Sequence, residues 1–401
     1  MIQMQSDSNA TGTLPHALMP GFRLILLIIF GWWMFSCGGD MSNSKMGNKE
    51  IDPPRITLDL QPGHNNPRNS EGDFITLNDG RIMFIYSKYV GESSSDHAPA
   101  SLAARYSSDG GLTWTSQDEI VVPNEGGMNV MSVSLLRLQS GEIALFYLRK
   151  NSTEDCIPML RISRDEARSW SEAIPCITDK QGYFVLNNAR VIQLKDGRLM
   201  MAVALHNTPG GEWKGQADLF AYYSDDNGQT WISSKKVPND TDIVTQEPGL
   251  IELKDGRIMM YIRASGGFQQ LSYSSDRGGT WSPIETSNIP SPLSPATIEK
   301  VPGSNDWLLV WNNNDGSNPE LKGKRTPITA AISSDEGKTW KYLKNIEDDP
   351  DGWYCYIAIH FVDEDNVLLG YCAGNRPAGT SLSVTHITHA TKDWLYQEVN
   401  Y

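Results

Sequence analysis

The octapeptide Ser107-Ser-Asp-Gly-Gly-Leu-Thr-Trp114 recurs along this chain of 401 residues. Close copies begin at Ser224 (SDDNGQTW), Ser274 (SSDRGGTW) and Ser333 (SSDEGKTW), and a diverged copy begins at Ser163 (SRDEARSW). Successive copies start 56, 61, 50 and 59 residues apart. A period of this length indicates a repeat architecture in which each repeat is one small antiparallel sheet.

Each residue type in the octapeptide suits a tight hairpin. An Asp side chain can hydrogen-bond the backbone of its own turn, and a Gly can adopt a positive φ. The closing Trp is expected to pack beneath the hairpin. We therefore interpret the octapeptides as structural units and expect none of their Asp side chains to be catalytic.

A second hairpin pattern, apolar-x-Leu-x-Asp-Gly-Arg-apolar, precedes most of the octapeptides. It occurs at 77–82, 138–143, 194–199 and 253–258, with looser counterparts at 298–309 and 359–368. Six pairs of hairpins predict six blades, the sixth without a clear octapeptide, and the segment 56–60 is expected to close that last blade. The predicted fold class is therefore an all-β, six-bladed β-propeller over residues 55–401.

Composition and charge limit the functions that this chain can have. The 35 Gly and 12 Trp suit short strands joined by tight turns. The net charge of −14 argues against nucleic acid as a partner, because phosphates need a basic surface. It leaves room for an anionic small substrate, since a local cluster of Arg can outweigh a distant acidic surface.

One apolar segment, residues 24–35, follows Arg23 and ends just before Cys37. It is short for a membrane span and has the layout of a secretory signal peptide. A Cys at this point resembles a bacterial lipobox, so we expect residues 1–37 to be a signal, Cys37 to be lipidated, and residues 38–54 to be a flexible tether. A plain secretory signal and a membrane anchor are the alternatives. The protein is thus predicted to be exported, in the periplasm or anchored to the outer membrane of a bacterium, and to be a monomer.

Four cysteines follow the predicted signal: Cys156, Cys176, Cys355 and Cys372. An even number in an oxidising compartment permits two disulfides, and free buried thiols are the alternative. Cys355 and Cys372 flank a predicted hairpin, so a cross-strand bridge is one possibility. No Cys or His spacing suggests a zinc site, and we expect no metal or other cofactor.

The predicted inner strands carry the candidate site residues, because the innermost strand of each propeller blade faces the central channel. These candidates are polar or aromatic and lie between the octapeptides: Arg68, Glu71, Asp73, Asn188, Arg190, Glu247, Arg263, Arg325, Tyr354 and Tyr356. Each has a structural alternative, such as a blade-to-blade ion pair for an Arg or core packing for a strand Tyr. Trp213, Trp353 and Phe184 lie in expected loops, where they either stack on a ligand or only pack.

With its repeated octapeptides, called Asp boxes, the chain resembles the sialidase superfamily, especially the BNR-repeat proteins and family 33 glycoside hydrolases, over residues 65–375. The resemblance implies that Arg68, Arg263 and Arg325 bind the carboxylate of an acidic sugar. It also implies that Tyr356 is the nucleophile, with Tyr354 as the competitor, and that Glu247 is its partner base. Three guanidiniums can bind one carboxylate bidentately, and a neutral Tyr avoids the repulsion that a carboxylate nucleophile would meet.

The sequence departs from the family where an acid/base Asp is expected, since Ser87 stands on the strand after the first turn. Asp96, in a loop that can reach the mouth of the funnel, is the candidate acid, and Glu71 and Asp73 are alternatives. The predicted function is an exported exo-α-sialidase acting on sialylated or other acidic glycans. The alternatives are a glycosidase or lyase on another acidic sugar and a carbohydrate-binding propeller without catalysis.

Overall fold

The computed structural model describes residues 51–398, which form 25 strands and one short helix. The predicted signal peptide 1–37, its lipidation site Cys37 and most of the tether lie outside these residues. No helix among residues 51–398 is long and apolar enough to span a membrane. The prediction of a nearly all-β protein is confirmed.

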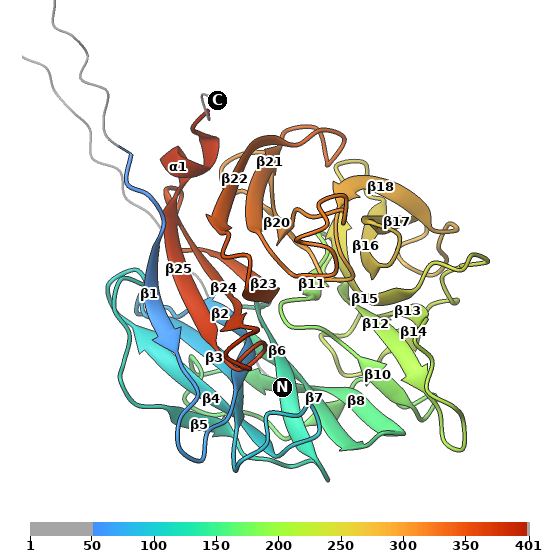
Figure 1. Ribbon diagram of the computed structural model, residues 1–401. Coiled ribbons are helices and arrows are strands. Elements are labelled where there is room, and N and C mark those ends of the chain that lie inside the picture. Colours follow the sequence, from blue (N-terminus) through green and yellow to red (C-terminus); the bar gives the residue numbers. More distant parts are fainter. Residues whose placement is uncertain (1–50, 399–401) are drawn as a thin grey trace, which may run out of the picture. The chain divides into compact units, whose positions relative to one another are not determined.

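The strands form consecutive antiparallel sheets, which Figure 1 shows side by side around a common centre. The first sheet contains β2 (Asn69–Thr76), β3 (Ile82–Tyr89), β4 (Ala100–Ser107) and β5 (Glu119–Val122). The next strands are β6 (Asn129–Arg137), β7 (Ile143–Ser152), β8 (Asp155–Ser163) and β9 (Ile174–Pro175). They are followed by β10 (Tyr183–Val185), β11 (Val191–Gln193), β12 (Leu199–Asn207), β13 (Asp218–Ser224) and β14 (Ile232–Ser233).

Two further sheets keep the same order of strands. One contains β15 (Thr245–Glu252), β16 (Ile258–Ala264), β17 (Phe268–Ser274) and β18 (Glu285–Pro290). The other contains β19 (Thr297–Lys300), β20 (Trp307–Asn312), β21 (Ile328–Ser333) and β22 (Lys341–Glu347). The last sheet contains β23 (Gly352–Phe361), β24 (Asn366–Asn375) and β25 (Thr385–Thr391), and the helix α1 (Lys392–Tyr396) follows it.

The strand β1 (Arg55–Leu60) pairs antiparallel with β25, with Arg55 opposite His389 and Leu60 opposite Thr385. The expectation that this segment completes the last sheet is therefore confirmed. The strands β6 to β14 pair as one nine-stranded sheet, because β8 and β10 share a single parallel bridge, Tyr183 to Cys156. Dividing the sheet at that bridge gives two units. These two units and the four other sheets are called blades 1 to 6 here, in chain order from the sheet of β2 to the sheet of β23.

The octapeptides form the hairpins that their sequence predicts. In the copy at Ser224, the Asp226 carboxylate accepts hydrogen bonds from Thr230 N at 2.9 Å and Thr230 Oγ1 at 2.6 Å. Gly228 has φ 85°, and a Cβ there would lie 2.3 Å from the side chain of Leu160 in blade 2. The same close approach occurs at Gly278, which faces Met200 of blade 3. The octapeptide hairpins therefore join each of these blades to the preceding one.

A backbone irregularity recurs on the inner strands. Five residues near the start of these strands have positive φ values: Glu71 at 56°, Ser132 at 59°, Ala189 at 52°, Glu247 at 38° and Tyr356 at 58°. Four of them lie where the strand register shifts, in β2, β6, β15 and β23. Side chains of a regular strand point alternately to its two faces, and a bulge re-aims the side chain at the irregular position. Non-Gly residues in this conformation are strained and cluster at functional sites.

The four cysteines of the propeller are free and buried, which selects the second of the two sequence-based alternatives. Cys355 lies opposite Cys372 in the pairing of β23 with β24, as the predicted hairpin requires. No group of three or more His, Cys, Asp or Glu among the described residues could hold a metal ion.

Candidate active site

A cavity of about 300 Å³ lies at the inner-strand bulges. Blades 4 to 6 contribute Gln246, Glu247, Arg263, Arg325, Trp353 and Tyr356 to its wall. Blades 2 and 3 contribute Met131, Ser132, Leu148, Lys150, Tyr183, Val185, Asn187, His206 and Trp213. Glu71 and Asp96 reach the cavity from blade 1. The residues with positive φ thus include Glu71, Ser132, Glu247 and Tyr356 of this wall.

Tyr356 and Glu247 form a hydrogen-bonded pair in the cavity wall. The Tyr356 hydroxyl donates a hydrogen bond to Glu247 Oε1 at 3.3 Å, although the two residues come from β23 and β15. Burial and the Glu247 carboxylate hold the pKa of Tyr356 well above its ordinary value. Burial acts to raise the pKa of Glu247, but Arg263 and Arg325 outweigh it and leave that pKa lowered. The resting pair is therefore a protonated phenol beside an ionised carboxylate.

Two arginines surround this pair. Arg263 Nη1 lies 2.7 Å from Glu247 Oε1, and both side chains retain about a tenth of their surface exposed (12% and 11%). The Arg325 guanidinium lies over the rings of Tyr356 at 5.7 Å and Trp353 at 5.0 Å. Its guanidinium donates a long hydrogen bond of 3.4 Å from Nη2 to the carbonyl of Leu293 and also interacts with the buried Cys355 side chain. Arg263 and Arg325 thus bring positive charge and spare donors to one cavity.

Several polar atoms of the cavity wall are buried and have no hydrogen-bond partner within the described part of the chain. They are Glu247 Oε2, Arg263 Nε, Asn187 Nδ2 and Trp353 Nε1. Buried polar groups in proteins are nearly always satisfied, so such atoms need an explanation. Their convergence on one cavity is the pattern expected of a site that a polar ligand completes.

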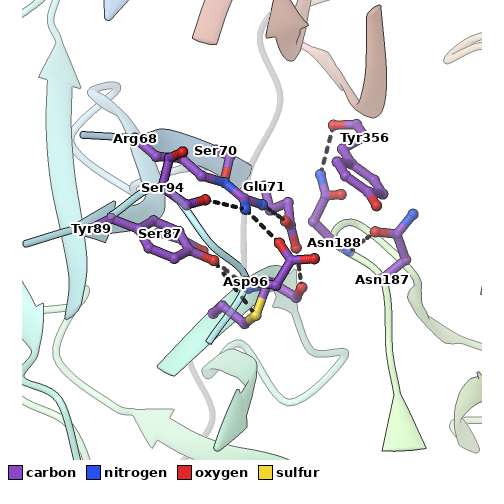
Figure 2. A network of polar contacts seen from close by, with 12 residues as sticks. Arg68, Ser70, Glu71, Ser87, Tyr89, Ser94, Asp96, Asn187, Asn188 and Tyr356 are labelled. Atoms are coloured by element: carbon purple, nitrogen blue, oxygen red, sulfur yellow. Dashed lines mark hydrogen bonds and ion pairs between the residues drawn. The ribbon is translucent and has the colours of Figure 1, made fainter. Parts of the chain in front are cut away.

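Arg68 lies behind this cavity and is only 1% exposed. Figure 2 shows its guanidinium between Glu71, Asp96 and the carbonyl of Ser94. Arg68 Nη2 is 2.6 Å from Glu71 Oε1, and Nη1 is 2.5 Å from Asp96 Oδ1. All of its donor nitrogens are thus occupied, because Nε also bonds Ser70 Oγ at 2.8 Å. An incoming anion can reach Arg68 only by replacing Asp96.

The two carboxylates of this end of the cavity differ in their surroundings. Asp96 is 56% exposed at its side chain and lies at the rim, and Arg68 outweighs the effect of burial and lowers its pKa. Burial raises the pKa of Glu71, whose two oxygens bond Arg68 and Ser132 Oγ. Glu71 is fully engaged in orienting Arg68, so Asp96 is the carboxylate that is free to exchange partners.

Ser87 takes no part in the cavity. Its Oγ accepts a hydrogen bond from the backbone of Ser132 at 3.1 Å, so it supports the bulge of β6. The strand position that lacks an acid is therefore occupied by a structural contact, and the exposed carboxylate at the rim of the cavity is that of Asp96.

Tyr354 and Tyr356 would share one face of a regular strand, but the bulge separates them. Tyr354 is buried and packs against Tyr371 with ring centroids 6.3 Å apart, away from the cavity. Tyr356 lines the cavity. Between the two candidates for the nucleophile, the geometry favours Tyr356.

Three of the predicted substrate contacts lie outside the cavity wall and hold blades together. The Asp73 carboxylate accepts hydrogen bonds from the backbone of Phe74 and of Leu135 in blade 2, both at 2.8 Å. Burial raises the pKa of Asp73 to about 8. Its buried, fully bonded side chain is a link between two inner strands and does not face a substrate.

Asn188 and Arg190 have the same structural role. Asn188 Nδ2 donates to the carbonyls of Gly72 at 2.9 Å and Tyr356 at 3.0 Å. The Arg190 guanidinium bonds Tyr261, Thr297 and the carbonyl of Ala296, at 3.2, 3.0 and 2.6 Å. The positive φ of Ala189, between them, directs the chain toward these neighbouring blades. Neither residue lines the cavity, and the donors named here bind neighbouring blades, so the structure gives Asn188 and Arg190 a structural role in place of the predicted substrate contacts.

Sequence reasoning did not name Ser132 and Lys150, two polar residues of the cavity wall. Lys150 is almost fully buried, and its Nζ donates to the carbonyl of Asp96 at 2.7 Å, so it fixes the loop of Asp96, called here the acid loop. Lys150 stands among other polar residues at the end of β7, so the strand pattern gave no signal. Ser132 carried none either, because its role depends on its positive φ.

The family model of the BNR repeat-like domain matches residues 105–371. A sialidase of Micromonospora viridifaciens is 25% identical over 308 residues, which are 68% of this chain and 44% of that protein. The chain spans about half the length of the curated relatives that it matches.

Two solved structures illustrate the likeness in fold. A protein of unknown function from Dyadobacter fermentans has a TM-score of 0.67 and 18% identity, over 85% of this chain and all of that one. A leech intramolecular trans-sialidase, solved with 2,7-anhydro-Neu5Ac prepared by soaking with 3'-sialyllactose, has a TM-score of 0.66 and 14% identity over 86% of this chain and 71% of that one. At these identities the likeness shows the fold alone, and that fold is the β-propeller of sialidases.

Proposed function

The chain belongs to the family of BNR repeat-like domains, and from this premise we propose that it is an exo-glycosidase that releases a terminal carboxylated sugar, with sialic acid as the first choice. The observation that carries the proposal is the hydrogen bond of Tyr356 to Glu247 between Arg263 and Arg325. A phenol, a base and two guanidiniums in one cavity suit a substrate that brings its own negative charge to the reacting carbon.

The first part of the proposal is the binding of the sugar carboxylate. Arg263 and Arg325 offer it charge-assisted hydrogen bonds, and Arg68 supplies the third guanidinium once Asp96 has moved away. This exchange links binding to catalysis. The carboxylate of the substrate pairs with Arg68 in place of Asp96, so the pKa of Asp96 rises. The Asp96 carboxyl group can then hold the proton that a general acid needs.

The second part is the formation of a covalent intermediate. The Tyr356 oxygen attacks the anomeric carbon while its proton passes to Glu247, and the bond to the leaving oxygen breaks as that oxygen takes a proton from Asp96. The neutral phenol approaches the negatively charged sugar without the repulsion that a carboxylate would meet. Glu247 is available to accept the proton, since its lowered pKa keeps the carboxylate ionised and its Oε1 already faces the phenol.

The third part returns the enzyme to its resting state. Asp96, now ionised, removes a proton from a water that attacks the anomeric carbon, and the bond from carbon to Tyr356 breaks. Glu247 then returns its proton to the phenolate, and Asp96 releases its proton to solvent when the product leaves and Arg68 pairs with it again. Two displacements at one carbon retain its configuration. A hydroxyl of the same sugar can replace the water, which would give an anhydro sugar as the product.

The test is the incubation of the purified protein with 3'-sialyllactose and with oligosaccharides that end in a uronic acid. We expect release of sialic acid, which product chromatography separates from its 2,7-anhydro form. Release of a uronic acid alone would show that the substrate is a uronic-acid glycan and not a sialoside. Release of neither acid at high protein concentration would refute the proposed glycosidase activity. If neither acid is released but the protein binds the intact glycan, it is a carbohydrate-binding propeller.

The role of Tyr356 is tested by Tyr356→Phe on whichever substrate is cleaved. We expect turnover to fall by at least about 1,000-fold, because the phenyl ring cannot form the covalent bond. Tyr354→Phe is the matched control, since it alters the same residue type on the same strand outside the cavity. Equal effects of the two substitutions would refute the role of Tyr356 as the nucleophile.

A further inference from the structure

Trp213 is an exposed indole at the rim of the cavity. It lies in the loop between β12 and β13, lines the cavity and is 53% exposed. Within residues 51–398 it is the one Trp, Tyr or Phe whose side chain is largely exposed. Burial of such a ring is favourable, so an indole left in solvent beside a cavity is available to a ligand.

The indole is held in one orientation although it is exposed. The His206 ring stacks on it with centroids 4.8 Å apart and planes 9° apart, and the edge of Tyr183 contacts it at 5.1 Å. The loop itself is fixed by His206, since Lys214 N donates to the His206 carbonyl and the His206 ring Nδ1 donates to the Lys214 carbonyl, both at 2.8 Å. Gln246 Nε2 adds a bond of 2.8 Å to the carbonyl of Gly215. A fixed aromatic face loses little entropy when a ligand binds.

A continuous set of contacts connects this indole to the acid loop. Lys150 Nζ bonds the carbonyl of Asp96 and lies 5.4 Å from the centre of the Tyr183 ring. The His97 ring, next to Asp96 in sequence, meets the edge of Tyr183 at 6.4 Å. Tyr183 in turn contacts Trp213. Asp96 and Trp213 therefore lie on one stretch of the rim, and each is more than half exposed.

We propose that Trp213 is the platform of a leaving-group subsite that binds the sugar to which the terminal acidic sugar is attached. This inference rests on the proposed function, because Asp96 marks the position of the leaving oxygen. The terminal sugar occupies the cavity between the arginines and the apolar wall of Met131 and Leu148. The next sugar must continue outward past Asp96, where the face of Trp213 can pack against the C–H groups of a pyranose ring.

The test compares two substrates that share the terminal sugar and differ only in the leaving group. The full chain and its Trp213→Ala variant are assayed with 3'-sialyllactose, which has a disaccharide leaving group, and with sialyl fluoride, which has none. We expect Trp213→Ala to lower kcat/KM for 3'-sialyllactose about tenfold, mainly through KM. For sialyl fluoride the change is expected to stay within about twofold, because fluoride does not reach the indole. Trp213→Phe should restore most of the loss.

Ile232→Ala is the matched control, since Ile232 is similarly exposed (55%) on β14, outside the cavity wall. It should change neither rate. Equal losses on both substrates with Trp213→Ala would overturn the subsite while the proposed function stands, because the indole would then act on the terminal sugar or on the fold. Turnover of neither substrate by the unaltered protein would refute the proposed function and this subsite with it.

Discussion

The substitution Glu247→Gln isolates the proton transfer from the rest of the site. Glutamine has the shape of glutamate, and its side-chain oxygen can still accept the hydrogen bond that Tyr356 now gives Glu247 Oε1 at 3.3 Å. It cannot accept the proton of the phenol. A positioned general base contributes a factor of about 100 to 10,000, so kcat for 3'-sialyllactose should fall within that range.

The same substitution has a cost in stability that can be estimated from the ion pair. Loss of one partner of a buried pair costs about 3–5 kcal/mol. Arg263 and Glu247 keep 12% and 11% of their side chains exposed beside an open cavity, so water compensates part of the loss and we expect about 2 kcal/mol. For a domain of this size, whose unfolding entropy is about 0.7 kcal/mol/K, that loss corresponds to a fall in Tm of about 3 °C.

The assay measures kcat by product release and Tm by calorimetry on the same preparations. Glu252→Gln, the same change on the same strand but away from the cavity, is the control and should leave kcat unaltered. Glu247→Ala gives a second readout, because formate can enter the space left by the side chain and should restore part of kcat in a saturable way. A kcat for Glu247→Gln within threefold of the unaltered protein would refute the role of Glu247 as the base.

Three other substitutions separate structure from chemistry. Asp276→Ala removes a carboxylate that bonds Thr280 N and Oγ1 at 2.9 and 2.6 Å, so the free energy of unfolding should fall by about 1–2 kcal/mol in denaturant titration while KM stays constant; a changed KM would contradict the structural role. Arg190→Met breaks three hydrogen bonds between blades and should destabilise by about 2–4 kcal/mol without altering kcat of the folded fraction; a selective rise in KM would return Arg190 to the site. In the free protein the Arg68 charge lowers the pKa of Asp96, and bound substrate neutralises that charge. With rising pH, kcat/KM, which reports the free protein, should therefore fall at a lower pH than kcat, which reports the complex. Asp96→Asn should abolish this fall in rate at high pH. If kcat and kcat/KM of the unaltered protein fell at the same pH, the replacement of Asp96 by the substrate carboxylate at Arg68 would be refuted.

The architecture was predictable from sequence because its determinants are local. The octapeptide at Ser224 needs only Asp226, Gly228 and Thr230 to close its hairpin, and the repeat spacing then sets the length of a blade. The closing strand was predictable for a related reason. The last sheet needs a partner for the free edge of β25, and the segment that begins at Arg55 is a strand-like stretch that no other blade uses.

The site was predictable only in part, because side-chain direction depends on the bulges. The sequence places Tyr354 and Tyr356 on one strand but does not show that φ of 58° at Tyr356 turns it into the cavity. In the same way it places Arg190 on an inner strand but not against Tyr261 and Thr297 of neighbouring blades. Contacts between residues far apart in the chain, such as that of Lys150 with Asp96, have no local signature.

The central claim is that Tyr356 is the nucleophile of a glycosidase acting on an acidic sugar. The most direct measurement is covalent trapping with a 2,3-difluoro sialic acid, in which the Tyr356 oxygen would displace the fluoride at the anomeric carbon. The fluorine at the neighbouring carbon slows the second displacement, so the adduct persists for digestion and mass spectrometry. We predict one added fluorosialyl group on the peptide that contains Tyr356, and none in Tyr356→Phe. Turnover of sialosides without any adduct at Tyr356, or an adduct on another residue, would contradict the claim.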